Sequence, residues 1–197
     1  MKPLVLVGGG GHCKAVIDVV ETEGNYKILG ILDAPERVGE EVLGYPVVAT
    51  DEAIGELARE GAWFLVTVGQ VGSARTRIRL FEAVKRHTDR FATVVSPLAR
   101  VSPHATVGRG TVVMHHALIN AHAVVGCNCI VNSKALVEHD ATVEKHCHVA
   151  TGAIVNGGTR VREGSFVGSG AVLREGVETR PGDFIKAGTL FKGYADG

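Results

Sequence analysis

The sequence lacks an excess of either charge, and it lacks any long apolar run. Lysine and arginine together number 21 among the 197 residues, aspartate and glutamate also number 21, and no block of like charge stands out. A basic footprint for nucleic acid or anionic lipid is therefore missing, and neither partner is expected. No stretch approaches the roughly 18 apolar residues of a membrane span, and the first residues have a strand pattern rather than a charged and then apolar leader. We therefore expect a cytoplasmic protein that does not insert into membranes.

Cysteine is also scarce, and its spacing does not match paired zinc motifs. The four cysteines are Cys13, Cys127, Cys129 and Cys147, and they form no pair of CxxC motifs. In a reducing compartment they would remain thiols. No metal site is expected from them.

What the second half does contain is an uninterrupted repeat of six residues. From Val95 to Phe191 the sequence divides into units such as VNSKAL, VEHDAT and VATGAI without a single insertion. Every unit begins with an apolar residue except the one at Thr179, and the fifth residue is Ala, Thr, Ser or Cys except at Val177 and Asp183. Neither helical nor two-residue periodicity would keep this register, so the pattern predicts a flat-sided coil with the first and fifth residues pointing inward.

This repeat resembles that of the hexapeptide-repeat acyltransferases. The resemblance implies a left-handed parallel β-helix in which three six-residue units complete one rung. Stacked rungs lie about 4.8 Å apart, so that residues 18 positions apart lie one above the other. Cys129 and Cys147 are separated by this interval in an inward column. We interpret both as small buried groups rather than as redox or metal-binding residues.

The first half alternates strand patterns with helix patterns. LVLV near the start, KILGIL ending at Asp33 and WFLVTV ending at Gly69 are typical of strands. Helices are expected over residues 15–21, 51–59 and 73–86. This alternation predicts a small Rossmann-like parallel sheet with helices packed on it. We therefore predict two domains, a Rossmann-like α/β domain over residues 1–94 and the β-helix over residues 95–197.

Four glycines, Gly8–Gly11, stand between the first strand and the first helix pattern in LVLVGGGGHCK. Ligands of parallel sheets bind beyond the carboxyl ends of the strands, where this loop, Asp33 and Gly69 fall. The dinucleotide fingerprint GxGxxG does not fit, because its third glycine would fall on Cys13 or Lys14. Backbone N–H groups at a helix start still suit a diphosphate, which favours a nucleotide carrying something smaller. A tight turn without a ligand is the alternative.

One of the nine histidines has two acidic neighbours. His139 lies in VEHDAT between Glu138 and Asp140, where an adjacent carboxylate can hold the imidazole in one tautomer and stabilise its protonated form. One rung above, Gly157 offers a backbone N–H with no side chain in the way, suited to donate to a developing oxyanion. From spacing alone, His139 is either a general base or a structural histidine.

Taken together, these motifs resemble one family. GGGGH, ILD and TVG in the first half, with VNSKALVEHDATVEKHCHVATGAIVNGG in the coil, are similar to the sialic-acid O-acetyltransferases and UDP-4-amino-sugar N-acetyltransferases of the bacillosamine-pathway type. The match covers nearly the whole chain. It implies an acyltransferase that acetylates the amine of a nucleotide-linked 4-amino-6-deoxysugar from acetyl-CoA, with no metal.

The resemblance also implies roles for individual residues. His139 matches the general base of a direct transfer, Asp140 the acid that raises its basicity, and Gly157 the amide near the thioester. The residues implied to contact acetyl-CoA are His148, Ser169 and Ala187. Those implied to meet the nucleotide sugar are Gly10, Gly11, His12 and Asp33, the last of which would read the base or the ribose.

Several points stay open in the sequence. The resemblance implies trimers with sites between subunits, so a homotrimer is expected. The sequence does not distinguish UDP, GDP and dTDP as the nucleotide of the substrate. O-acetylation of free sialic acid is the main alternative activity. Zinc chemistry of the gamma-class carbonic anhydrase type is another, for which the only histidines one rung apart are His104 and His122. A non-catalytic trimeric scaffold is the third, and the ending FKGYADG departs from the family's usual GxPAK, which leaves contacts with distal CoA undefined.

Overall fold

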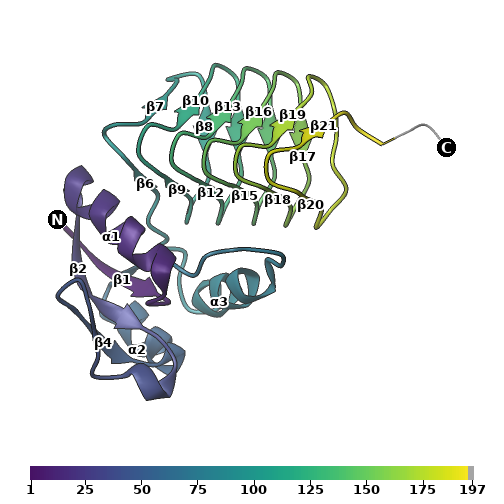
Figure 1. The fold of residues 1–197 in the computed structure, drawn as a ribbon. Coiled ribbons are helices and arrows are strands. Elements are labelled where there is room, and N and C mark those ends of the chain that lie inside the picture. Colours follow the sequence, from purple (N-terminus) through teal and green to yellow (C-terminus); the bar gives the residue numbers. More distant parts are fainter. Residues whose placement is uncertain (195–197) are drawn as a thin grey trace.

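The computed structural model describes residues 1–194, so the last three residues of the ending FKGYADG lie outside the described residues. It confirms the predicted fold class, a Rossmann-like sheet followed by a parallel β-helix of the left-handed type (Figure 1). β6 (Val94–Val95) spans the domain boundary expected after residue 94, and that boundary stays a prediction.

The N-terminal sheet has the strand order β3-β4-β2-β1-β5. Its strands are β1 (Lys2–Val7), β2 (Tyr26–Leu32), β3 (Glu41–Val42), β4 (Tyr45–Ala49) and β5 (Trp63–Val66). All neighbours are parallel except β3 and β4. Strands β3 and β4 were missed in the sequence because they are short and are interrupted by Gly44 and Pro46, a pattern typical of loops and edge strands.

Helices cover both faces of this sheet. Leu4 and Leu6 pack in one core with α1 (Gly11–Glu23), and Val5 and Val7 pack in a second core with α2 (Ile54–Arg59) and α3 (Arg75–Lys85). Short 3-10 helices are η1 (Pro35–Arg37) and η2 (Asp51–Ala53). Because successive side chains of a strand point to opposite faces, the single apolar run LVLV supplies both cores.

The coil consists of two-residue strands in three parallel sheets. The first sheet contains β6, β9 (Val112–Val113), β12 (Ile130–Val131), β15 (His148–Val149), β18 (Phe166–Val167) and β20 (Phe184–Ile185). The second contains β7 (Arg100–Val101), β10 (Leu118–Ile119), β13 (Leu136–Val137), β16 (Ile154–Val155), β19 (Val172–Leu173) and β21 (Leu190–Phe191). The third contains β8 (Thr106–Val107), β11 (Val124–Val125), β14 (Thr142–Val143) and β17 (Arg160–Val161).

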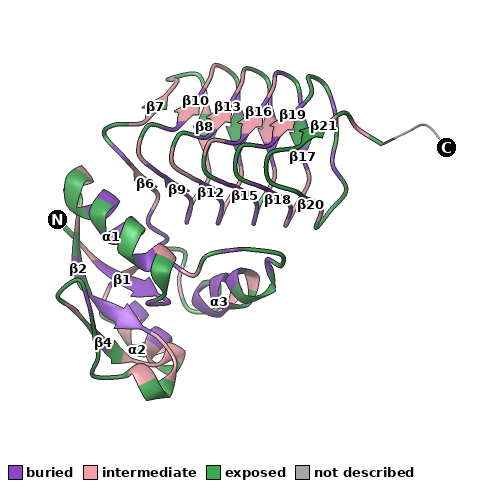
Figure 2. Cartoon of the chain, viewed as in Figure 1, coloured by how far each residue is buried: buried purple, intermediate pink, exposed green. Residues whose placement is uncertain are grey.

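The register confirms the rung length expected from the repeat. Val137 pairs with Val155, one rung on, and both side chains are fully buried. The small fifth residues from Thr111 to Ala171 are buried as well, including Cys129 and Cys147. Figure 2 shows buried segments, in purple, recurring along the coil. A core of this kind gains its stability from apolar surface removed from water rung by rung.

From Gly110 to Gly188 the corners of the coil impose a backbone requirement on the fourth residue of each unit, which has a positive φ. His122 and Asp140 have φ values of 59° and 60°, and Gly158 has 65°. This left-handed region is costly for side-chain residues other than Asn and Asp and free for glycine. The corner positions are therefore occupied by glycine in some units and by a polar residue in others.

The two halves share a core where the first sheet faces the N-terminal half, a region that we call the joint. Ile17 of α1 lies in one cluster with Val112 and Ile130 of the first sheet. Arg77 of α3 is 1% exposed and donates to the carbonyl oxygens of Val66, Val68 and Asn128. The joint therefore fixes the N-terminal half against the coil through both apolar packing and a buried hydrogen-bond network.

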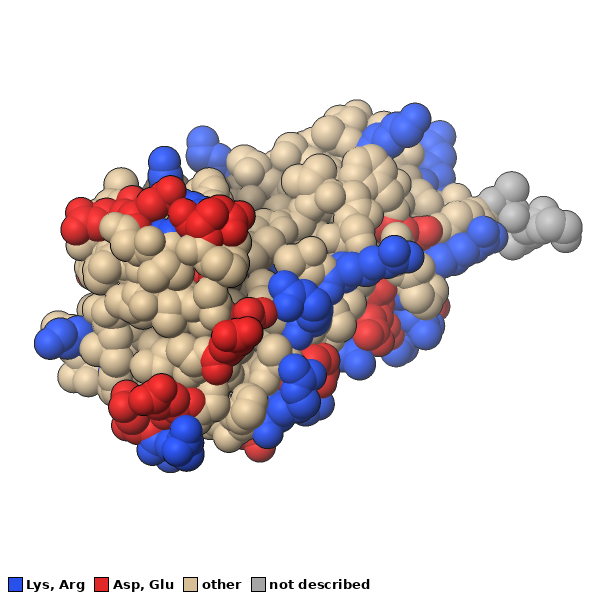
Figure 3. Space-filling view, turned by 90° about the horizontal axis from the view of Figure 1, so that it is seen from below, with Lys and Arg blue, Asp and Glu red and all other residues tan. Residues whose placement is uncertain are grey.

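Two predictions about the surface can be compared with the structure. On the face drawn in Figure 3, basic and acidic side chains are interspersed and neither sign covers the face. Among the helices of residues 1–194, none has the length and apolar character required to span a bilayer.

Candidate functional site

His139 lies exposed at the corner between the second and third sheets, which we call the His139 corner. Its Nδ1 is 2.8 Å from Oδ2 of Asp140. Because a carboxylate only accepts hydrogen bonds, Nδ1 carries the proton and Nε2 has its lone pair directed away from Asp140. The hydrogen bond with Asp140 raises the pKa of His139 above its ordinary value. The geometry thus provides a base with a fixed tautomer.

Glu138 supports the backbone of this corner rather than the imidazole ring. Its Oε2 accepts hydrogen bonds from Nδ2 of Asn120, at 2.7 Å, and from the backbone N–H of His139, at 3.2 Å. Asn120 lies in the rung below. The two carboxylates of the EHD tripeptide therefore have different tasks, Glu138 fixing the main chain and Asp140 the ring.

Gly157 lies directly above the ring of His139. A Cβ atom on Gly157 would come within 2.8 Å of Cε1 and 2.9 Å of Nε2 of His139, closer than real Cβ contacts allow. Only glycine therefore leaves the ring in its observed place, and Gly157 brings its backbone to the free nitrogen of the base.

The N–H of Gly157 is also open, whereas the equivalent N–H groups of Ala121, Ser133 and His139 each donate to the side chain of the preceding residue. The side-chain Oδ1 of Asn120 accepts from the next N–H, that of Ala121, at 2.8 Å. Asn156 precedes Gly157 in the same way, but its amide donates instead to the carbonyl of Leu173. Within residues 1–194 the N–H of Gly157 has no acceptor. It is placed to donate to an oxygen that arrives beside His139.

Ser169 and Ala187 lie at another corner, between the first and second sheets. Both are exposed, and they stack in successive rungs, with the carbonyl of Ser169 accepting from Gly188 N–H at 2.9 Å. Within one chain these residues do not meet His139, because the second sheet lies between the two corners.

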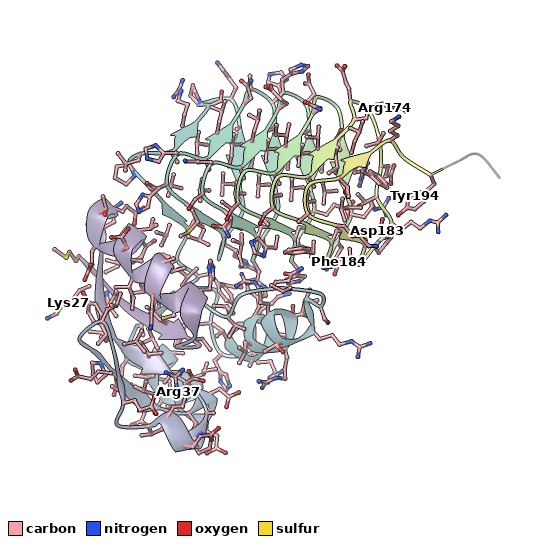
Figure 4. All side chains as sticks on the ribbon, in the orientation of Figure 1. Lys27, Arg37, Arg174, Asp183, Phe184 and Tyr194 are labelled. Atoms are coloured by element: carbon pink, nitrogen blue, oxygen red, sulfur yellow. The ribbon has the colours of Figure 1, made fainter. Side chains whose placement is uncertain are left out.

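His148 faces the joint from the first sheet. Its Nδ1 donates to the carbonyl of Gln70 at 2.7 Å, and its Nε2 accepts from Nδ2 of Asn132 at 3.1 Å. Burial lowers the pKa of His148 to about 4, so that the ring is neutral and uses both nitrogens within the protein. Beyond it the aromatic rings of Phe166 and Phe184 continue along the sheet with centroid spacings of 5.2 and 5.1 Å, and Phe184 lies at the far end of the coil (Figure 4).

The glycine loop of the N-terminal half approaches the same face. Gly10 caps α1 without a side-chain hydrogen bond, the first turn holds no acidic residue, and a Cβ on Gly10 or Gly11 would meet open space. His12 follows, with its ring centroid 6.4 Å from that of His148. The residue is partly exposed, but its Nε2 is buried and finds no hydrogen-bond partner among residues 1–194. Burial lowers the pKa of His12 to about 3.

Asp33 braces the glycine loop and borders a cavity. Its carboxylate accepts from the N–H of Gly9 at 2.7 Å, from Ala34 N–H at 2.8 Å and from Arg37 at 2.6 Å. A cavity of about 400 Å³ lies at the carboxyl ends of β1 and β2, bordered by Gly8 and Asp33 but not by Gly10, Gly11 or His12. This is the position at which parallel sheets bind ligands.

Comparison with known proteins extends these observations. The PglD N-terminal domain family matches residues 3–84. The acetyltransferase domain of PglB from Neisseria gonorrhoeae FA1090 superimposes with a TM-score of 0.90 at 32% identity, covering 98% of this chain and 92% of that one. The same domain in complex with acetyl coenzyme A gives 0.87 at 33% identity, covering 95% and 89%. PerB from Caulobacter crescentus, in complex with CoA and GDP-perosamine, gives 0.89 at 32% identity, covering 98% and 90%. The chain belongs to the hexapeptide-repeat acetyltransferases with a PglD N-terminal domain.

A curated member of this acetyltransferase family is also similar in sequence. UDP-N-acetylbacillosamine N-acetyltransferase of Bacillus subtilis (strain 168) is 34% identical over 119 residues, which is 58% of this chain. The alignment spans 52% of the length of that relative. The family resemblance inferred from GGGGH and EHD is thereby confirmed.

The sequence analysis did not single out the residues that hold His148 or those that link the two halves at the joint. Asn132 and Gln70 hold His148, and Arg77 binds Asn128 across the joint. Gln70 lies 78 positions from His148, too far for any local signal. For the zinc alternative, the rings of His104 and His122 do lie 6.4 Å apart, and residues 1–194 contain no group of three or more potential His, Cys, Asp or Glu ligands around one point.

Proposed function

We propose that this protein transfers the acetyl group of acetyl-CoA to the amine of a nucleotide-linked 4-amino-6-deoxysugar, with His139 as general base. The observation that carries the proposal is the contact of His139 Nδ1 with Asp140 at 2.8 Å, below an open backbone N–H of Gly157. The relatives support the substrate class, since one is named for UDP-N-acetylbacillosamine and another holds CoA and GDP-perosamine.

His139 acts first, because the amine must lose a proton as it attacks. Nε2 of His139 accepts that proton while the amine nitrogen bonds to the thioester carbon, and Asp140 stabilises the imidazolium that forms. Gly157 N–H donates to the carbonyl oxygen as it becomes an oxyanion. When the C–S bond breaks, the imidazolium of His139 returns its proton to the CoA sulfur. The products are the acetamide and CoA thiol, and no covalent acyl-enzyme is needed.

The glycine loop and the cavity beside it form the proposed acceptor site. The uncapped N-terminus of α1 at Gly10, Gly11 and His12 offers backbone donors and a partial positive charge for a diphosphate. The cavity next to Asp33 is of a size for the nucleoside. Since the carboxylate of Asp33 is already held by Gly9, Ala34 and Arg37, its first task is to shape the loop.

A trimer would complete the site. The outward side chains of the second sheet form an apolar stripe, and the N-terminal half does not cover it. Its members are Leu118, Leu136, Ile154, Val172 and Leu190, of which Leu190 is 57% exposed. Burying this stripe against a neighbouring chain would place the His139 corner of one subunit beside the Ser169 corner of the next. His148, Ser169 and Ala187 would then hold acetyl-CoA for the base of the neighbour.

The test is a thiol-release assay with acetyl-CoA and a panel of acceptors. The panel contains UDP-, GDP- and dTDP-linked 4-amino-6-deoxysugars and free sialic acid, and His139→Asn is the matched variant. Turnover with a nucleotide amino sugar, lost in the variant, is the expected result. Turnover with sialic acid alone would show that the reaction is O-acetylation of sialic acid and not N-acetylation. Absence of any CoA binding would favour a non-catalytic scaffold protein. Sedimentation of the 20.7 kDa chain before and after Ile154→Glu tests the trimer.

A further inference from the structure

Asp140 lies between two histidines, of which the proposed mechanism uses only one. Its Oδ2 contacts Nδ1 of His139 at 2.8 Å, and its Oδ1 lies 3.7 Å from Nδ1 of His122 in the rung below. The second distance is too long for a hydrogen bond but short enough for an ion pair when His122 is protonated. Asp140 is therefore the centre of a three-residue cluster on the outer edge of the coil.

The backbone fixes this arrangement. The N–H of Asp140 donates to the carbonyl of Ala121 at 3.1 Å, and the N–H of His122 donates to the carbonyl of His104 at 3.2 Å, so the corner turns stack directly. The next residue up the column is Gly158, which has no side chain. Of the two neighbours in this column, only His122 can therefore reach the second oxygen of Asp140.

Few other charged side chains lie close to the cluster of His122, His139 and Asp140. Besides Asp140, the carboxylates of Glu138 and Glu175 face His139. The ring of His122 packs edge-on against that of His104, with 6.4 Å between centroids. Both His122 and Asp140 keep more than half of their side-chain surface exposed in the single chain, with relative accessibilities of 75% and 60%. A charge on His122 thus acts on His139 mainly through Asp140.

We propose that His122 is a positioning residue for the base: it holds the second oxygen of Asp140 and, through its own charge, sets the proton affinity of His139. The inference rests on the proposed role of His139 as general base. It assigns a task to a histidine that touches neither substrate in the proposed reaction.

The sign of the effect follows from electrostatics. A positive charge on His122 draws Asp140 toward itself and repels a proton on His139, which lowers the pH at which His139 becomes the free base. Removing that charge should move the acid limb of the kcat/KM profile to higher pH, and a permanent charge should move it to lower pH. For exposed charges about 6 Å apart the shift is about half a pH unit.

The coil supplies matched variants for this test. His122→Asn removes the charge and keeps a residue that tolerates the left-handed backbone at φ 59°. His122→Lys makes the charge permanent, and Lys134 already occupies an equivalent fourth position at φ 59°. His87→Asn is the control, since His87 is exposed and follows α3 in the N-terminal half, outside the coil.

The experiment is the pH profile of kcat/KM for the three variants at low and high salt. We expect the acid limb to move to higher pH in His122→Asn, to lower pH in His122→Lys and not at all in His87→Asn, with both shifts smaller at high salt. Shifts of the same sign in both His122 variants, or none beyond the control, overturn the inference. A wild-type protein that transfers no acetyl group, or a His139→Ala variant with full activity, overturns the proposed function instead.

Discussion

The His139 corner and the joint treat the same kind of side chain in opposite ways. At the corner, His139 is exposed and hydrogen-bonded to a carboxylate, which raises its pKa. At the joint, His148 is buried and hydrogen-bonded to a carbonyl, and its pKa falls to about 4. Proton transfer needs the first environment and fixed orientation needs the second. The difference separates a residue suited to chemistry from one suited to placing a neighbour.

The strongest test of this comparison is the removal of the exposed ring. We expect His139→Ala to lower kcat about 10² to 10⁴ fold, because general-base catalysis contributes on this scale. The thermal midpoint should stay near that of the wild type, because the side chain is exposed. Steady-state kinetics and a melting curve check both parts, and a loss of stability equal to that of a joint variant would break the comparison.

At the joint, the largest effect is expected on stability. Arg77→Met should lower the free energy of unfolding by about 3 kcal/mol, because three buried carbonyl groups and Asn128 lose their donor. Denaturant unfolding measures this loss. Arg79→Met serves as control: Arg79 pairs with Asp51 on the surface, with 65% of its side chain exposed, and should cost less than about 1 kcal/mol.

Gly157 allows the comparison to be sharpened without touching a titratable group. Its φ is not in the left-handed range, so Gly157→Ala adds only a methyl group that meets the His139 ring. Displacing the base should lower kcat about tenfold to a hundredfold, since small misplacements of catalytic groups have effects of this order. The KM for acetyl-CoA should change little. An unchanged kcat would show that the ring position beneath Gly157 does not matter.

The smallest effect concerns the pH dependence of stability. His148 is neutral in the folded chain with a pKa near 4 and takes up a proton near pH 6.5 when unfolded, so that stability falls as pH drops through this window. Between pH 6.5 and 5 this residue should account for about 2 kcal/mol of that loss. Urea unfolding of His148→Gln across this range should give a flatter dependence than the wild type. Equal slopes would contradict the assigned burial effect.

The sequence predicted the length of each rung of the coil and the residues that face inward, whereas it did not predict the contacts of the joint. A six-residue repeat fixes which residues face inward, and His139 and Asp140 are neighbours in the chain, so that spacing alone brought them together. The bond between His148 and Gln70 and that between Arg77 and Asn128 join residues from different halves. Such contacts depend on how two folded units dock, and no periodicity records that.

The N-terminal half shows the same limit on a smaller scale. The strands that are buried on both faces, β1, β2 and β5, have apolar runs that identify them. The hairpin of β3 and β4 has Val48 46% exposed and carries a proline, so its sequence looks like a loop. The use of Asp33 as a brace for Gly9 was also hidden, because it depends on the side chain turning back toward the preceding strand's loop.

The strict pairing of residues 18 positions apart has a consequence for how such chains can diverge. Adding or deleting one residue within the coil would turn every later side chain onto a different side of the prism and expose the inner column. Whole rungs, by contrast, can be gained or lost while His139 keeps its neighbours above and below. Length variation among related chains should therefore occur in steps of complete rungs or in segments that leave the prism at a corner and return to it.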